Sequence, residues 1–141
     1  MLCSTFRFHL VNMGYKRKPI PKKTRELVWN KYGHKCAYCG CDLEYKDMQV
    51  DHVYSVAYAH WNKEKREDLD DISNLMPSCR MCNFYKGVSD IERFRKHLLE
   101  TLCKTAVASF QTRLAIKYGM VVVQEWDGKF WFEKFEETPQ Q

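Results

Sequence analysis

Four cysteines are arranged as two Cys-x-x-Cys pairs, a spacing that is typical of metal ligands. Cys36 and Cys39 form the first pair and Cys79 and Cys82 form the second, with 39 residues between the pairs. Each pair can place two sulfurs on one tetrahedral zinc ion, so that both pairs would complete a closed structural site. Four unrelated buried thiols are the alternative. A redox role fits poorly, because it would need only one pair.

Polar residues that could carry chemistry lie between and just after these pairs. Asp51 and His52 are adjacent, Asn74 follows His52 by 22 residues, and Asn83 comes directly after the last cysteine. An imidazole can accept a proton from water at neutral pH, and carboxylate and amide oxygens suit a hard cation such as Mg²⁺. Each residue alone has an ordinary explanation, such as a surface histidine, a turn former or a helix N-cap. Their joint placement around two cysteine pairs favours a catalytic site.

Positive charge is concentrated at the start of the chain. The net charge is +5, and it divides into +8 over residues 1–35, −4 over 36–82 and +1 over 83–141. A basic arm before an acidic centre indicates a polyanion bound by the arm and a cation bound at the centre. A solvated basic tail is the alternative. The candidate contacts to a phosphate backbone are Lys16, Arg17, Lys18, Lys22, Lys23, Arg25 and Lys86.

The elements that would position these residues follow from the hydrophobic pattern. It predicts a helix over 24–32, in which Leu27 and Val28 share a face with Tyr32, and a short strand over 49–53. Residues 60–73 are highly charged and predict an exposed loop. The chain then returns to the core at Asn74.

The C-terminal part is predicted to be helical and then β. Ser89 and Glu92 have the spacing of a capping box, and apolar residues recur at helical spacing from 91 to 118. Residues 121–135 contain two β-rich runs around Asp127 and Gly128, which predicts a hairpin. We expect its aromatic residues to pack against the helices. If they formed an exposed patch instead, they could support a homodimer.

Composition excludes several classes of protein. The chain has 141 residues, of which 45% are hydrophobic and 29% charged, so disorder is a poor fit. No apolar run approaches the roughly 18–20 residues of a bilayer span, and no secretory signal is evident. We therefore expect a cytoplasmic protein with no membrane partner. In that compartment the seven cysteines indicate metal ligands or free thiols rather than disulfides.

Taken in order, these motifs resemble one known family. Cys-x-x-Cys, Asp-His-Val, Asn-Leu and Cys-x-x-Cys-Asn-x-x-Lys over residues 33–87 are similar to the HNH endonucleases of the ββα-metal (His-Me finger) type with a zinc-knuckle pair. Asn83 stands at the third position of the motif in place of histidine. The resemblance implies an α+β fold with a ββα-metal HNH core and a four-cysteine zinc site. An N-terminal helix and a C-terminal helical segment plus β-hairpin would flank this core.

The resemblance also implies a reaction and a role for each residue. DNA would be the substrate, and its phosphodiester bonds would be hydrolysed by nicking or double-strand cleavage. His52 would act as general base, and Asp51 and Asn83 would hold a divalent cation such as Mg²⁺. Asn74 would brace the loop and orient the His52 ring. Because neighbouring side chains on a strand point to opposite faces, Asp51 and His52 would need local distortion to address one phosphate. A zinc-stabilised DNA-binding or interaction module without cleavage is the alternative.

Two features depart from the family pattern. Many members have a proline shortly after the Asp-His pair, where this chain has Tyr54. The acidic segment 60–73 would repel phosphate unless it faces away, pairs with the basic arm or helps to bind metal. Small solitary proteins of this kind resemble those of bacteria and their phages. The expected organisation is a basic arm (1–23), the HNH core (24–90), helices and hairpin (91–135) and a flexible tail (136–141).

Overall fold

The structure, a computed structural model, describes residues 19–65 and 67–138. Lys16, Arg17 and Lys18 of the basic arm therefore lie outside the described residues. Within these ranges, none of the helices has the length and hydrophobicity that a bilayer crossing requires. The elements in chain order are α1 (Lys22–Asn30), β1 (Gln49–His52), α2 (Val56–Trp61), η1 (Ile72–Asn74), β2 (Leu75–Ser78), α3 (Arg80–Lys86), α4 (Ile91–His97), η2 (Leu98–Leu102), α5 (Cys103–Ala108), α6 (Phe110–Lys117) and α7 (Trp131–Glu137).

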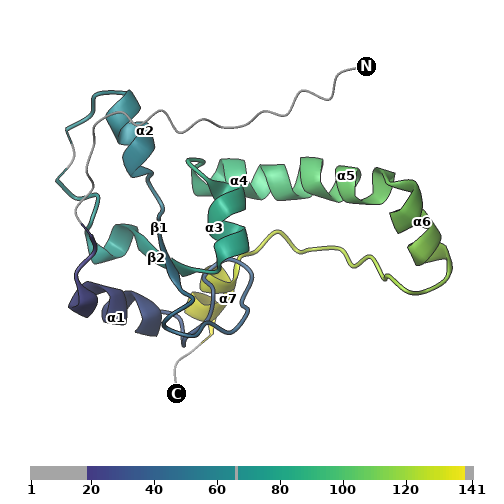
Figure 1. Cartoon of the computed structure of the whole chain (residues 1–141), viewed down its shortest axis with the longest axis horizontal. Coiled ribbons are helices and arrows are strands. Elements are labelled where there is room, and N and C mark those ends of the chain that lie inside the picture. The colour runs from purple at the N-terminus through teal and green to yellow at the C-terminus, as the bar shows by residue number, and fades with distance from the viewer. Residues whose placement is uncertain (1–18, 66, 139–141) are drawn as a thin grey trace.

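A two-stranded antiparallel sheet followed by a helix forms the centre of the molecule. Strand β1 pairs with β2 in a register that sets Asp51 opposite Met76 and His52 opposite Leu75. Helix α3 follows β2 directly and contacts β1 (Figure 1). The predicted strand at 49–53 and the return to the core after Asn74 are both confirmed. The fold class is α+β, as expected.

Helix α1 closes one side of this centre. It begins at Lys22, two residues earlier than predicted, because Pro21 has the extended backbone that precedes a helix. Val28 and Tyr32 are buried as expected, whereas Leu27 is 54% exposed. The Trp29 indole donates a hydrogen bond of 2.9 Å to the Leu43 carbonyl and so ties the helix to the following loop. The core is built around Val28 of α1 and Tyr32, which follows that helix, together with Met48, Leu75, Phe94 and Phe130.

The predicted hairpin over 121–135 is wrong: its second half is helix α7, and its first half is irregular (Figure 1). The backbone N–H of Phe130 is bound at 2.7 Å by the carboxylate of Glu133, which begins the helix as a capping box does. Asp127 still makes a turn, since its carboxylate accepts the N–H of Lys129 at 3.0 Å.

The C-terminal segment forms a helix rather than a strand because its backbone binds the turn that holds Cys36 and Cys39, called the first knuckle below. The N–H groups of Trp131 and Phe132 donate to the carbonyls of Tyr38 and Ala37, at 3.1 and 2.8 Å. These donors are therefore not available to a strand at 121–126, and Phe130 is buried at 1% exposure against the core. Tertiary contacts thus outweighed the β propensity of the aromatic run.

Residues 136 and 137 of the expected flexible tail belong to helix α7, and residues 139–141 lie outside the described residues. Helix α7 continues to Glu137, whose carboxylate binds the Lys129 ammonium at 2.7 Å. The carboxylate of Glu136 accepts a hydrogen bond of 3.1 Å from the Tyr32 hydroxyl. Because Tyr32 belongs to the core, this bond joins α7 to the segment that follows α1.

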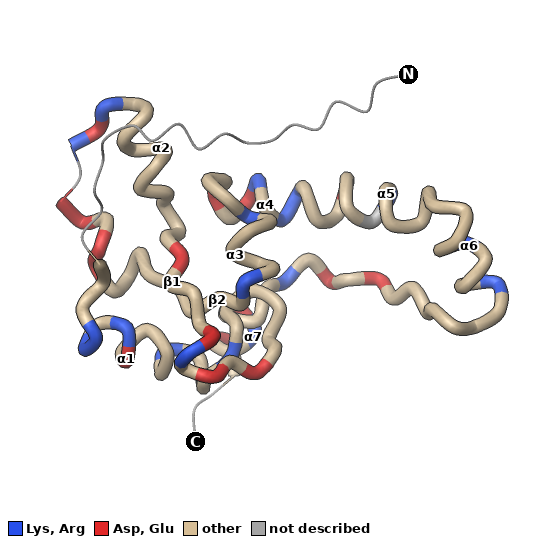
Figure 2. The backbone as a smooth tube through the Cα atoms, in the orientation of Figure 1, with Lys and Arg blue, Asp and Glu red and all other residues tan. Residues whose placement is uncertain are grey.

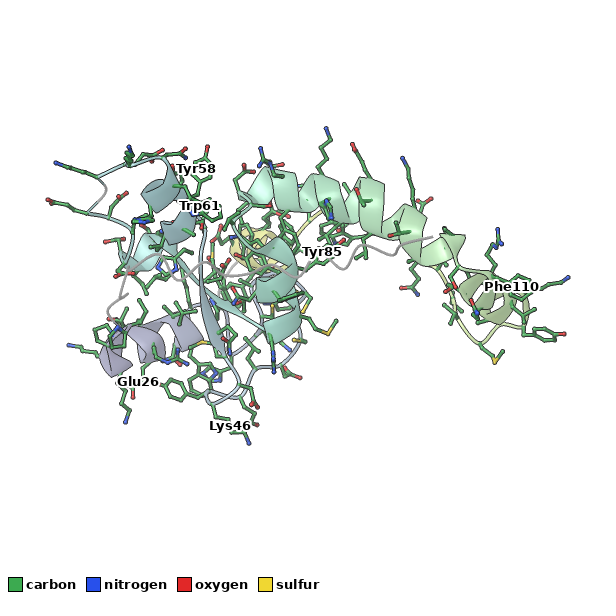
Figure 3. The ribbon with its side chains drawn as sticks, turned by 45° about the horizontal axis from the view of Figure 1, so that its top comes forward. Glu26, Lys46, Tyr58, Trp61, Tyr85 and Phe110 are labelled. Carbon is green, nitrogen blue, oxygen red and sulfur yellow. The ribbon has the colours of Figure 1, made fainter. Side chains whose placement is uncertain are left out.

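Helices α4, η2 and α5 run on as one arm that extends from the core and carries α6 at its end (Figure 1). Asp90 caps the arm, accepting the N–H of Arg93 at 2.7 Å, so the expected capping residue Ser89 is off by one position. The predicted buried face is correct at Phe94, which is 2% exposed, but Leu102 is 40% exposed. Phe110 lies at the far end of the arm and is 66% exposed (Figure 3).

Candidate metal centre and catalytic site

The four predicted zinc ligands gather at one point. The sulfurs of Cys36, Cys39, Cys79 and Cys82 all lie within 4.8 Å of one another, and those of Cys39 and Cys79 are 3.9 Å apart. A tetrahedral zinc ion with Zn–S bonds of about 2.3 Å holds its sulfurs about 3.8 Å apart. The donor set therefore fits zinc in both chemistry and size. Among the described thiols, Cys41 is not a member of this cluster.

Backbone hydrogen bonds hold the two cysteine pairs together. The Cys36 sulfur accepts the N–H of Cys79 at 3.3 Å, and the Cys79 sulfur accepts the N–H of Cys82 at 3.4 Å. Cys79 is thereby the N-cap of α3 as well as a predicted ligand. The N–H of Ala37 donates to the carbonyl of Pro77 at 2.8 Å, which links the first knuckle to β2. A zinc ion here would fasten α3 and the sheet to the first knuckle.

The four thiols are close enough to shift one another's pKa values. Hydrogen bonds from Cys36 and Cys82 lower the pKa of Cys39 to about 3. Hydrogen bonding to Cys36 and Cys39, together with burial, raises the pKa of the Cys82 thiol far above its usual value. One sulfur therefore ionises at the expense of its neighbours. A bound Zn²⁺ would offset the charge of several thiolates at once.

Asp51 is held by two buried partners on the side of β1 that faces α3. Its Oδ2 accepts a hydrogen bond from the Tyr38 hydroxyl and lies 3.0 Å from the Lys86 ammonium. The Asp51 side chain is only 7% exposed. Burial, together with the neighbouring charge of Asp51, raises the pKa of Tyr38 well above its usual value, so the hydroxyl stays protonated and donates. Both contacts use Oδ2, which leaves Oδ1 as the oxygen that could face a cation.

Lys86 does not have the exposure that a phosphate contact needs. Its side chain is 0% exposed, and besides the ion pair with Asp51 it donates a hydrogen bond of 2.9 Å to the carbonyl of His52. The expectation that Lys86 binds nucleic acid is therefore wrong. Lys86 lies on the face of α3 that packs on β1, so its side chain is covered by the sheet instead of being exposed to solvent. Lys86 instead fixes both residues of the Asp-His pair.

His52 is buried at 5% exposure and is bound through its ring to the acidic segment. Its Nε2 lies 2.9 Å from Oδ1 of Asp70. The Asp51 and His52 side chains thus have different partners, as the alternation of a strand requires. Reasoning from sequence missed both Asp70 and Tyr38. In the sequence, only the acidic composition of residues 60–73 pointed to Asp70, and composition does not identify which residue it contacts.

Asn74 joins the two sides of the loop between β1 and β2. Its side-chain oxygen accepts the N–H of Tyr54 at 2.8 Å, and its amide nitrogen donates to the carbonyls of Tyr54 and Leu69, at 3.2 and 2.8 Å. These bonds tie the segment that follows His52 to the segment that carries Asp70. The role of Asn74 in orienting the His52 ring stays a prediction.

Asn83 lies on α3 one turn before Lys86 and is half-buried. Residues three apart on a helix share a face, so the side chain of Asn83 starts from the same side of α3 as the ammonium that binds Asp51. The amide oxygen of Asn83 and the carboxylate of Asp51 are ligand types that Mg²⁺ accepts. The pair therefore fits a divalent cation in donor chemistry, and its role as a metal site stays a prediction.

Basic residues remain exposed on α1, and acidic ones lie along the segment between α2 and η1 (Figure 2). Lys22 and Lys23 are exposed and could reach a phosphate. Arg25 already has partners within the protein. Its guanidinium donates a hydrogen bond of 3.0 Å to the Met48 carbonyl and lies over the Tyr45 ring. Among the predicted phosphate contacts that the structure describes, Lys22 and Lys23 are therefore the ones that are exposed to solvent.

Comparison with known proteins points to one family. Residues 36–88 match the family model of the HNH endonuclease. A segment of 65 residues is 29% identical to the SPbeta prophage-derived putative HNH endonuclease YoqL of Bacillus subtilis (strain 168). The match covers 43% of this chain and 28% of that relative. No solved structure gives a significant match. The resemblance of this segment to the HNH endonucleases is thereby confirmed.

Proposed function

Because residues 36–88 match the HNH endonuclease family, we propose that this chain is a metal-dependent endonuclease that hydrolyses DNA phosphodiester bonds. One observation supports this most directly: a buried, hydrogen-bonded His52 lies beside a buried Asp51 on a strand that α3 and the cysteine cluster hold in place. A histidine and a carboxylate fixed in this way are suited to proton transfer and to cation binding.

In the proposed reaction, the His52 ring accepts a proton from a water molecule as that water attacks the phosphorus. The bond between phosphorus and the 3′-oxygen breaks, and that oxygen takes up a proton from solvent, so the products carry 5′-phosphate and 3′-hydroxyl ends. Asp51 and Asn83 would hold the divalent cation, with Mg²⁺ as the expected ion. Such an ion supplies Lewis-acid stabilisation of the negative charge on the departing oxygen. Lys86 and Tyr38 keep the Asp51 carboxylate in place.

The cysteine cluster has a structural role in this proposal. Four sulfur ligands leave no open position on a tetrahedral zinc ion, so zinc would not take part in the reaction. Its position between the first knuckle, β2 and α3 would instead stabilise the segments that carry Asp51 and Asn83. Removing the catalytic cation and removing zinc should therefore have different effects: the first stops cleavage, and the second unfolds the core.

DNA would be bound through its phosphates by the basic residues of α1 and of the preceding arm. Lys22 and Lys23 have the exposure for this, and Lys16 to Lys18 extend the same charge along the sequence. Binding of this kind releases counterions, so affinity should fall steeply as salt is added. A cytoplasmic location in a bacterium, or in a cell infected by a phage, would give such an enzyme access to its substrate.

Cleavage of a supercoiled plasmid tests the proposal. Purified protein is incubated with Mg²⁺ and the plasmid, and nicked and linear products are separated by gel electrophoresis. We expect the wild-type protein to cut and His52→Ala to be inactive. His97→Ala is the matched control, because His97 is an exposed histidine on α4 whose ring packs near Tyr85 and which has no role in the proposed reaction. It should cut at the wild-type rate.

Mapping the ends of the products then distinguishes nicking from double-strand cleavage and tests the expected 5′-phosphate. If a folded, zinc-loaded protein left the plasmid intact in Mg²⁺, Mn²⁺ and Ni²⁺, the nuclease proposal would fail. A gel-shift assay with the same DNA would then separate a binding module from a protein with no affinity for DNA.

A homodimer remains a prediction, although the apolar patch that would support it is different from the one expected. One group of exposed apolar side chains lies at the end of the helical arm, on α6 and the residues that follow it, and includes Phe110, Tyr118, Met120 and Val122. Light scattering at several protein concentrations would test this directly. A charged substitution at Val122, which is 75% exposed, should shift any dimer toward monomer without unfolding the core.

A further inference from the structure

We infer that residues 120–125 pair with the same residues of a second copy of the chain, as two antiparallel β-strands. This pairing assigns an interface to the predicted homodimer, and it does not depend on the nuclease activity. The segment follows α6 at the far end of the arm and runs back toward α7 (Figure 1). Its sequence, Met-Val-Val-Val-Gln-Glu, contains the β-branched run that is typical of a strand, but it has no strand partner among the described residues.

The backbone of this segment is available for pairing. The N–H groups of Met120 and Val121 donate to the carbonyl of Ala115 on α6, at 2.9 and 3.3 Å. Beyond them, the backbone of residues 122–125 makes no hydrogen bond to any residue that the structure describes. The exposed fraction alternates along the run, at 72%, 43%, 75% and 52% for Met120, Val121, Val122 and Val123. This alternation is that of a strand with two different faces, so an unpaired strand edge is open to solvent.

An apolar stripe on α6 lies beside this segment. Phe110, Leu114 and Tyr118 follow one another at intervals of four, so they share one face of the helix, and they are 66%, 42% and 73% exposed (Figure 3). Of the side chains that are described between residues 99 and 125, none is buried. A ribbon of two strands alone is only marginally stable in water. Burial of the stripe against the second copy would supply further stabilisation.

The apolar area at the end of the arm is sufficient for a pair of copies. An aromatic side chain offers about 150–250 Å² and an aliphatic one about 60–120 Å². With the exposed fractions above, the stripe and residues 120–123 expose on the order of 400–700 Å² in each copy. The largest apolar patch of an ordinary monomer is about 300–600 Å². Two copies would together bury about 800–1,400 Å², which includes the roughly 1,000 Å² that a specific interface needs.

The segment is complementary to itself. In an antiparallel pair with two-fold symmetry, one residue must lie opposite its own copy, because residues opposite each other share a face of the sheet. With Val122 at that position, Val121 of each copy lies opposite Val123 of the other. All three valines then have a valine as cross-strand neighbour, and pairs of β-branched residues pack well on a sheet. A second copy thus supplies a matching free edge by symmetry.

Charges at the two ends of the segment favour the same arrangement. Lys117, the last residue of α6, and Glu125 are both exposed. With Val122 on the two-fold axis, Glu125 of one copy lies opposite Gly119 of the other, two residues from that copy's Lys117. Opposite charges therefore meet at both ends of the pair. A parallel pair in register would instead place the two Glu125 carboxylates side by side, which is unfavourable.

Light scattering of the zinc-saturated full chain, without DNA, tests the pairing. The concentrations run from about 1 to about 200 µM, because an interface of this size can be as weak as micromolar. We expect a reversible equilibrium between monomer and dimer. Val122→Pro removes a backbone donor, so it should raise the Kd of the dimer by about tenfold or more. Val122→Thr is the matched control, because it keeps the N–H and the β-branched shape, and it should raise the Kd by less than about threefold.

Charge substitutions test the register. Glu125→Lys and Lys117→Glu should each raise the Kd by about tenfold, because each replaces two attractions by two repulsions. The double variant Glu125→Lys/Lys117→Glu restores opposite charges, and its Kd should return to within about threefold of the wild-type value. Glu100→Lys makes the same charge change at an exposed residue of η2, outside the proposed interface, and should leave the Kd unchanged.

Hydrogen exchange followed by mass spectrometry locates the interface on the chain. Exposed amides without a partner exchange quickly, and pairing slows them. The amides of residues 122–125 should therefore exchange slowly at high protein concentration and quickly at low concentration. In Val122→Pro they should exchange quickly at both concentrations. Circular dichroism and zinc content confirm that each variant is folded.

The outcomes separate this inference from the nuclease proposal. A chain that is monomeric throughout the series would overturn the pairing, as would a dimer that survives Val122→Pro or in which the amides of 122–125 still exchange quickly. A double charge variant that does not recover would overturn the antiparallel register. A monomer that cuts the plasmid would refute the interface alone, and a dimer that fails to cut it would refute the nuclease proposal alone.

Discussion

Replacing Lys86 by methionine is expected to destabilise the fold strongly, because Lys86 is a buried cation with two partners. Its ammonium lies 3.0 Å from Asp51 Oδ2 and 2.9 Å from the His52 carbonyl, and its side chain is 0% exposed. Methionine has a similar volume and fills the same space without charge. The variant would leave the Asp51 carboxylate buried with the Tyr38 hydroxyl and without its ammonium.

The magnitude follows from what each partner loses. Breaking a buried ion pair by removing one member costs about 3–5 kcal/mol, since the remaining charge is left without compensation. The bond to the His52 carbonyl is part of that loss, and one hydrogen bond contributes about 1 kcal/mol. We therefore expect Lys86→Met to lower the free energy of unfolding by about 3–5 kcal/mol. The double variant Lys86→Met/Asp51→Asn buries no charge and should be less destabilised than the sum of the single variants.

Urea denaturation of the zinc-saturated protein, followed by tryptophan fluorescence, measures these differences. A double-mutant cycle isolates the coupling between Lys86 and Asp51, which we expect to exceed about 1 kcal/mol, in the range found for residues in contact. Lys35→Met is the matched control, because Lys35 pairs with Asp42, whose side chain is 92% exposed. An exposed pair is worth about 0–1 kcal/mol, so this change should be small. Equal effects of Lys86→Met and Lys35→Met, or additive costs in the cycle, would refute the reasoning.

Three further predictions concern the zinc cluster, α7 and the core. Cys82→Ser should lose the single zinc ion that elemental analysis is expected to find in the wild-type protein, and its circular dichroism should show an unfolded core; a folded, metal-free variant would rule out the zinc site. Hydrogen bonding to Arg95 lowers the pKa of Glu133. The ionised Glu133 carboxylate therefore stabilises the fold fully above the usual glutamate pKa of 4.5, and this stabilisation is lost as pH falls through the lower pKa of the folded state. The difference in unfolding free energy between wild type and Glu133→Gln should therefore shrink below that pH, and a constant difference would contradict this. Phe130→Ala should lower the free energy of unfolding, measured by denaturant titration, by about 3–5 kcal/mol, because Phe130 is 1% exposed. Phe110→Ala should lower it by less than about 0.5 kcal/mol, because Phe110 is 66% exposed. Similar losses for the two variants would contradict the placement of Phe130 in the core.

The sequence by itself indicated which residues could form the site, and it predicted the elements nearest to them. Cys36 and Cys39 are candidate ligands whose spacing places both sulfurs on one side of a tight turn, and this local geometry does not depend on the rest of the fold. The strand that carries Asp51 and His52 was predicted for a similar reason, since alternation and β propensity are local properties. The charged segment 60–73 was correctly expected to be largely exposed, although it contains the end of α2 and the beginning of η1.

Only the tertiary structure decided the partners of these groups and the form of the C-terminal segment. Lys86 was expected at the surface and is buried against Asp51, because the face of α3 that carries it packs on β1. The run after Asp127 was expected to be a strand and is a helix, because the N–H groups at its start bind the carbonyls of Tyr38 and Ala37. The contact of Asp70 with His52 joins residues 18 positions apart. Such contacts depend on how distant segments pack, and periodicity along the chain carries no information about that packing.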